Sequence, residues 1–136
     1  MKINRLIIIG LIFIYISVIV YYTLYDRNIM IQYKYDLIPF WSYIAIVKGQ
    51  QHLLYLNLMN ILMFVPLGCM IRFVCREIKL SYIAFFAGIL SLCIEAIQLV
   101  TKRGTFEFDD IIHNVIGCMI GIYIYNRLAI KYKEYV

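Results

Sequence analysis

Four long apolar runs divide this chain, and they constrain its fold more than any other feature. They cover residues 6–25, 53–74, 81–100 and 111–130, and a helix needs about 20 such residues to cross a bilayer. The 136 residues are 64% hydrophobic and 15% charged, which is more apolar surface than a small water-soluble domain can bury. In lipid, the backbone of each run must satisfy its own polar groups, so the runs predict helices. We expect an all-α integral membrane bundle of four transmembrane helices, forming a single domain over residues 1–136.

The connector between the first two runs, residues 26–52, is rich in aromatic residues. Aromatic rings with a polar edge collect at the membrane surface, so this connector is expected to lie along the interface. Within it, Pro39 suits the first turn of a short helix and Gly49 suits its end. We therefore expect an interfacial or re-entrant segment here, and the periodicity does not separate the two.

The net charge of +5 comes from basic residues that sit mostly at the ends of the runs. Such positions are typical of topology signals and lipid headgroup contacts, so no nucleic-acid partner is predicted. Eight basic residues fall on one side of the predicted membrane (Lys2, Arg5, Arg72, Arg76, Lys79, Arg127, Lys131 and Lys133). Five fall on the other (Arg27, Lys34, Lys48, Lys102 and Arg103). The excess predicts a multi-pass protein with both termini in the cytoplasm.

Cysteine and histidine residues give no sign of a metal or redox centre. The four cysteines lie in or at the ends of the apolar runs without CxxC spacing, which is typical of small buried residues. His52 and His113 lack the HExxH spacing of zinc sites, so interfacial placement is expected for both. We predict no metal and no cofactor.

Polar side chains recur inside three of the runs at intervals of three or four residues. That spacing places the polar residues of each run on one helix face. An ionisable residue inside an apolar span costs about 2.5–3.5 kcal/mol, so Glu95 needs a partner or a function. The polar positions are Asn57 and Asn60 in the second run, Ser91, Glu95 and Gln98 in the third, and Asp110 and Asn114 in the fourth.

Two glycines continue the last of these faces. Gly117 and Gly121 form a small-xxx-small pair, which in membrane helices permits close contact between helices. We expect both to serve helix packing.

The three polar faces are expected to converge at one side of the membrane. Asn57 lies near the start of its run, Glu95 near the end of the next and Asn114 near the start of the last. Because successive spans reverse direction, all three fall roughly 6 to 8 Å below the same surface. This predicts a shallow polar pocket that opens outward. Arg103, in the connector above it, would pair with a carboxylate or hold a phosphate.

Four motifs in order resemble the VanZ-like family. They are LIPF at Leu37–Phe40, NxxNxxxFxPLG at Asn57–Gly68, SxxxExxQ at Ser91–Gln98 and RGTFEFDDIIHNxxG at Arg103–Gly117. Two positions depart from the pattern: Asp36 stands where the family often has Asn, and His113 where it usually has an apolar residue.

The resemblance implies a bacterial membrane protein associated with low-level resistance to the lipoglycopeptide teicoplanin or with envelope homeostasis. Combined with the pocket, it leads us to predict a non-enzymatic protein that binds a lipid or a lipid-linked envelope component, with a lipoglycopeptide as a further candidate ligand. The predicted ligand-binding residues are Asn57, Asn60, Glu95, Gln98, Arg103, Asp110 and Asn114.

Two other functions are compatible with the same residues. In one, the protein is a membrane-embedded enzyme that acts on a lipid headgroup, with Glu95, Asp109 and Asp110 as candidate catalytic residues. In the other, the polar side chains form a satisfied network that only fixes helix packing. The sequence names neither the ligand nor an oligomeric state.

Overall fold

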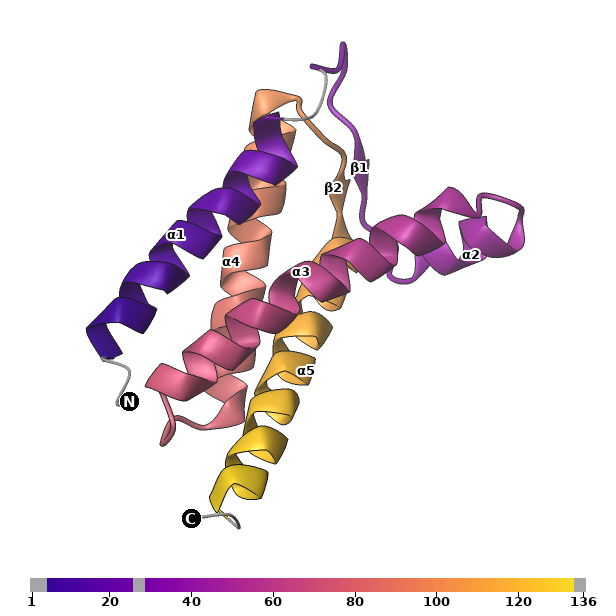
Figure 1. Cartoon of the computed structure of the whole chain (residues 1–136). Helices are drawn as coiled ribbons and strands as arrows, with labels where there is room; N and C mark the ends of the chain where they lie inside the picture. The colour runs from indigo at the N-terminus through magenta and orange to yellow at the C-terminus, as the bar shows by residue number, and fades with distance from the viewer. Residues whose placement is uncertain (1–4, 26–28, 134–136) are drawn as a thin grey trace.

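The computed structural model describes residues 5–25 and 29–133 and is built from five helices (Figure 1). Each predicted run lies within one helix. The helices are α1 (Arg5–Tyr25), α2 (Trp41–Val47), α3 (His52–Val74), α4 (Leu80–Thr101) and α5 (Phe108–Lys133). Lys2 and Arg27, two of the residues used to predict orientation, lie outside the described residues. The fold is all-helical apart from one short strand pair.

Three of these helices, α1, α3 and α4, are long and apolar enough to cross a membrane. α5 has 26 residues but is less apolar, because its first turn carries Asp109 and Asp110 and its last turns carry Asn126 and Arg127. Large apolar side chains are exposed on the outer faces of the bundle, among them Phe13, Leu54 and Phe85. Such a surface is suited to lipid rather than to water, and the chain is a membrane protein.

The core is organised around the contact between α3 and α5, the closest in the bundle. A Cβ atom added at Gly117 would collide with the carbonyl oxygen of Ile61, and one added at Gly121 would collide with that of Val65. On the opposite helix, a Cβ at Gly68 would collide with Cys118. The glycines therefore allow the two backbones to touch, which is the geometry that small residues permit in membrane helices.

The other helices surround this pair. In Figure 1, α1 and α4 lie side by side, and α1 and α3 diverge toward the end of the bundle that carries the strands. Beyond that divergence, α2 runs alongside the first part of α3. The beginning of α1 and the end of α5 lie at the opposite end of the bundle (Figure 1).

A two-residue parallel strand pair joins the first connector to the connector between α4 and α5. β1 (Tyr35–Asp36) pairs with β2 (Phe106–Glu107), and the Met30 amide adds a hydrogen bond to the Lys102 carbonyl at 2.8 Å. The sequence did not predict these strands, because two residues carry no periodicity. The pairing holds the first connector over the ends of α4 and α5.

The short helix of the first connector begins two residues after Pro39. Phe40 precedes it in the left-handed region, at φ 63°, and Gly49 follows it at φ 105°. A glycine adopts such a φ without steric cost, which explains why the chain turns back toward α3 at that point. The predicted short helix is therefore present, with its start displaced toward the carboxyl end.

Candidate functional site

Asp109, in the first turn of α5, anchors the start of α2. Its carboxylate accepts hydrogen bonds from the Phe40 amide, from the Ser42 amide at 3.0 Å and from the Ser42 hydroxyl at 2.6 Å. The Asp109 side chain is 1% exposed. Since the first amides of a helix have no partner within the helix, a carboxylate supplied from α5 satisfies them. Asp109 was a candidate catalytic residue, and this arrangement gives its carboxylate a positioning role.

Ser42 extends the anchor to a third helix. Its hydroxyl, which donates to Asp109, also accepts a hydrogen bond from the Asn57 amide at 3.1 Å. Ser42 and Asn57 are both buried. A continuous chain of side-chain hydrogen bonds thus ties α5 to α2 and α2 to α3.

His113 is buried in the protein rather than exposed at its surface. Only 1% of its surface is exposed, and its Nε2 atom lies 2.8 Å from the hydroxyl oxygen of Tyr43. His113 follows Asp109 by one helical turn, so both side chains face α2. The histidine therefore belongs to the same anchor.

The polar faces of α4 and α5 meet each other directly. Asn114 donates a hydrogen bond to the Ser91 hydroxyl at 2.8 Å, and both are buried. One turn closer to the strands, Glu95 is 2% exposed and accepts a hydrogen bond from the Glu107 amide at 3.0 Å. Because the helices are antiparallel and Ser91 faces Asn114, Glu95 comes to the level of Asp110. The glutamate therefore points into the protein rather than toward lipid.

Arg103 lies in a different place from the one predicted. Lys102 ends α4 in the left-handed region at φ 56°, and the Arg103 amide then bonds the Gln98 carbonyl at 3.0 Å. The guanidinium lies 5.6 Å from the ring centre of Tyr25 and donates a long hydrogen bond, 3.4 Å, to the Leu24 carbonyl. Arg103 thus contacts the end of α1.

A groove of about 750 Å³ opens between α1 and α3, where these helices diverge. Its wall is partly polar and partly apolar or aromatic. Its lining residues are Tyr15, Tyr22, Thr23, Leu53, Tyr55, Leu56, Asn57, Met59, Asn60, Leu62, Met63, Glu107 and Asp110. A mixed lining of this kind is typical of ligand sites, which combine an apolar wall with a few placed polar groups.

The predicted site residues divide into three groups. Asn57, Asn60 and Asp110 line the groove. Glu95, Gln98 and Asn114 are buried in the helix bundle, where Glu95 and Asn114 take part in the contacts of α4 with α5 and β2. Arg103 is placed against the end of α1.

Four residues that build this region are not among the predicted site residues: Ser42, Tyr43, Glu107 and His113. Asp109 and His113 are four residues apart, a spacing that indicates a shared face directed away from that of Asp110 and Asn114. The spacing therefore indicates that Asp109 and His113 share a face, but it does not indicate that their partners lie on α2.

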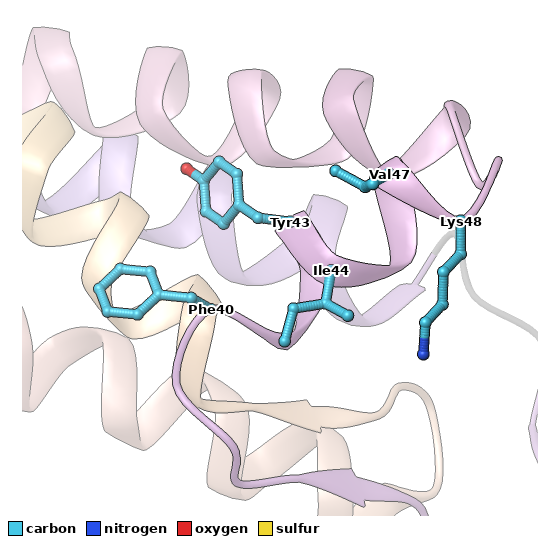
Figure 2. Close-up of a pocket in the computed structure, with 5 residues that line it drawn as sticks. All are labelled: Phe40, Tyr43, Ile44, Val47 and Lys48. Carbon is cyan, nitrogen blue, oxygen red and sulfur yellow. The ribbon is translucent and has the colours of Figure 1, made fainter.

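A second hollow, of about 380 Å³, lies along the exposed side of α2 (Figure 2). It is lined by Phe40, Tyr43, Ile44, Val47 and Lys48. Val47 is 88% exposed, and Figure 2 shows Lys48 at the far end of the hollow from Phe40. An apolar face that ends in a lysine is suited to the boundary between acyl chains and headgroups.

Two comparisons with known proteins give matches. The VanZ/LLP1 family matches residues 6–130. Protein VanZ of Enterococcus faecium is 30% identical to this chain over 66 residues, which are 48% of this chain and 41% of that protein. The match thus spans about two fifths of the length of this curated relative. No solved structure matches the chain.

Proposed function

The chain belongs to the VanZ/LLP1 family, and on this premise we propose that it binds a lipid or a lipid-linked envelope component in the groove between α1 and α3. The observation that carries the proposal is the lining of that groove. Polar residues, among them Asn57, Asn60 and Asp110, share that lining with apolar residues such as Met59 and Met63. A ligand with a polar head and an acyl tail matches both parts.

The proposal includes a membrane arrangement. α1, α3, α4 and α5 all cross the bilayer, with the strands at the outer surface and both termini in the cytoplasm. The polar start of α5 is compatible with crossing, because Asp109 and Asn114 are buried against other helices rather than exposed to lipid. α2 then lies in the outer interface, with its exposed apolar side toward the acyl chains.

The groove would be open to the outer leaflet. α1 and α3 diverge toward the strand end of the bundle (Figure 1), so a lipid could enter sideways between them without first leaving the membrane. Its head would then reach Asn57 and Asp110 while its tail lay beside Met63, farther along α3.

The biological consequence we propose is low-level resistance to lipoglycopeptides such as teicoplanin, or maintenance of the envelope. Teicoplanin carries an acyl chain and acts outside the membrane. A protein that holds lipids or lipid-linked precursors at the outer leaflet would reduce the access of such an antibiotic to its target. This role predicts a rise in the inhibitory concentration of teicoplanin when the protein is produced in a susceptible bacterium.

Ligand binding is tested by a substitution that places a larger side chain in the groove. Met59 is 43% exposed and lines the groove, so Met59→Trp should obstruct it, whereas Leu92, which is 42% exposed on α4, is absent from the lining. Lipids retained by the purified proteins are counted by native mass spectrometry. We expect Met59→Trp to lose the retained lipid and Leu92→Trp to keep it. Equal retention by both variants would refute the proposal.

A second candidate function is favoured by one observation. Two acidic residues, Glu107 and Asp110, are among those that line the groove, and carboxylic acids are a residue type that general acid–base catalysis uses. An enzyme leaves an altered product. The lipid profile of cells with and without the protein therefore separates the two functions, and we expect it to be unchanged.

A further inference from the structure

We propose that the hollow along α2 is a second lipid site, which takes one acyl chain of an anionic phospholipid of the outer leaflet and binds its phosphate through Lys48. The site is separate from the groove between α1 and α3, because the two share no lining residue. The inference rests on the membrane arrangement given with the proposed function, in which the strand end of the bundle is outermost.

The wall of the hollow is one face of a helix that the rest of the protein leaves uncovered. The lining residues before Lys48 have the i, i+3, i+4, i+7 spacing of a single face, and they are Phe40, Tyr43, Ile44 and Val47. Each of them is at least 43% exposed. The buried residues of α2 are Ser42 and Ala45, which lie on the opposite face. An exposed strip of large apolar side chains is suited to contact with acyl chains.

Contacts with α5 hold the Phe40 end of the hollow in place. The hydroxyl oxygen of Tyr43 lies 2.8 Å from Nε2 of the buried His113, and the Phe40 amide donates to the carboxylate of Asp109. The rings of Phe40 and Tyr43 lie 6.2 Å apart. Tyr43 and the backbone of Phe40 are therefore fixed before a ligand arrives, which lowers the ordering cost of binding.

The hollow has the orientation of a lipid in the outer leaflet. α2 runs antiparallel to the first part of α3, because a short connector joins them and Ser42 bonds Asn57 at 3.1 Å. In the proposed arrangement α3 carries the chain inward from His52, and Asn57 lies roughly 7 Å farther along it. The start of α2 is therefore deeper than its end. Phe40 and Lys48 lie at opposite ends of the hollow (Figure 2), so a lipid whose acyl chain lies beside Phe40 has its head at Lys48.

Lys48 supplies the positive charge that an anionic head requires. Its side chain is exposed, and its ammonium has no hydrogen-bond or ion-pair partner among residues 5–25 and 29–133. Lys34 is also exposed, whereas the acidic residues described at the strand end are partly or fully buried: Asp36, Glu107, Asp109 and Asp110. A phosphate accepts the hydrogen bonds that an ammonium donates. One lysine near an anionic membrane surface favours binding roughly fivefold.

The test uses Trp41, the single tryptophan of the chain, which follows Phe40 at the inner end of the hollow. Because the hollow lies on the exposed side of α2, its lipid exchanges with the bilayer, so the protein is placed in phosphatidylcholine nanodiscs. Phosphatidylglycerol or phosphatidylcholine with the same brominated acyl chains is added over the same series of mole fractions, and quenching of Trp41 fluorescence is measured. We expect phosphatidylglycerol to reach half-maximal quenching at a roughly fivefold lower mole fraction.

Substitutions place this preference in the hollow. Lys48→Gln should remove the preference and Lys48→Arg should keep it, whereas Lys34→Gln removes the other exposed lysine and should have no effect. Val47→Asn makes the wall polar and should raise the mole fraction of phosphatidylglycerol that quenching needs. Val100→Asn makes the same change at a 74% exposed position of α4 and should not. Thermal unfolding of each variant verifies that it is folded.

Three results would overturn the inference. Equal quenching by the two lipids would show that the hollow does not select a negative charge, and a preference that Lys48→Gln leaves intact would place the selection elsewhere. Weak quenching by both lipids at every mole fraction would mean that another occupant, such as a second copy of this chain, covers α2. None of these results concerns the groove, whose proposed function fails separately if Met59→Trp retains its lipid.

Discussion

The carboxylate of Asp109 binds both the amide and the hydroxyl of Ser42, at 3.0 and 2.6 Å, across 67 positions of the chain. α2 has no side-chain cap of its own, so its first turn depends on an acid that belongs to α5. Through the bond from Asn57 to Ser42 at 3.1 Å, the same contact reaches a residue of the groove wall. The anchor of α2 and one side of the groove therefore form one hydrogen-bonded unit.

Replacing Asp109 by asparagine should loosen α2. Both oxygens of the Asp109 carboxylate accept hydrogen bonds, from the Phe40 amide and from Ser42. An asparagine has an NH₂ group in place of one oxygen, so its amide hydrogens would face at least one of these donors. Leaving buried donors unsatisfied costs about 1–3 kcal/mol. We expect residues 40–47 to exchange amide hydrogen faster in Asp109→Asn, measured by mass spectrometry. Asp36→Asn, the same change in β1, is the control, and equal exchange in both variants would contradict the anchor.

Methyl groups at the α3–α5 contact should destabilise the bundle. A Cβ at Gly121 would collide with the Val65 carbonyl oxygen, whereas a Cβ at Gly10 meets nothing within 4 Å. Overpacking a close contact costs about 1–3 kcal/mol. We expect Gly121→Ala to lower the melting temperature in detergent and Gly10→Ala to leave it unchanged or raised. Similar melting temperatures for the two variants would show that the helices separate at little cost.

The bond from Asn114 to Ser91 should appear as a coupling energy. Ser91→Ala leaves a buried amide without its partner, and Asn114→Leu removes the amide, so the double variant should be less destabilised than the sum of the two. The expected coupling is about 0.5–3 kcal/mol in the free energy of unfolding. Strict additivity would mean that the bond does not hold α4 to α5.

The sequence was sufficient to predict the helices and the polar faces. Runs of about 20 apolar residues can satisfy their backbone only as helices in lipid, so each predicted run lies within one helix of the structure. The spacing of Ser91 and Glu95, and of Asp110 and Asn114, predicted common faces for a similarly local reason. Residues three or four positions apart share a face of the same helix, so the sequence of that helix alone is enough to predict the face.

Features that join distant segments could not be predicted in this way. β1 and β2 are two residues each, too short for a pattern, and the α5 partners of Ser42 and Tyr43 lie 67 and 70 positions away. Arg103 is expected beside a carboxylate because opposite charges attract, but its guanidinium contacts Leu24 and Tyr25 of α1. Those contacts join segments about 79 positions apart, so the sequence around Arg103 does not indicate them.

Removing the Arg103 side chain should affect α1 more than the groove. Its guanidinium contacts Leu24 and Tyr25, and an exposed cation–π contact contributes about 0.5–1 kcal/mol. We expect Arg103→Ala to speed hydrogen exchange in residues 19–25 and to retain lipid as the wild type does. Arg103→Lys, which keeps the charge, is the control. Lipid loss in Arg103→Ala with unchanged exchange in α1 would place the arginine in ligand binding after all.

Labelling of single cysteines should show which ends of the helices face outward. Gln50, between α2 and α3, and Lys131, near the end of α5, are exposed, and Ile78, between α3 and α4, is 44% exposed. Each is replaced by cysteine in a chain whose native cysteines, Cys69, Cys75, Cys93 and Cys118, are changed to alanine. A membrane-impermeant maleimide should label Gln50→Cys in intact cells. It should label Ile78→Cys and Lys131→Cys only after permeabilisation, because α3 and α5 each carry the chain inward from the strand end. Labelling of Lys131→Cys in intact cells would mean that α5 does not cross, and the opposite pattern at all three sites would invert the orientation that the excess of basic residues predicts.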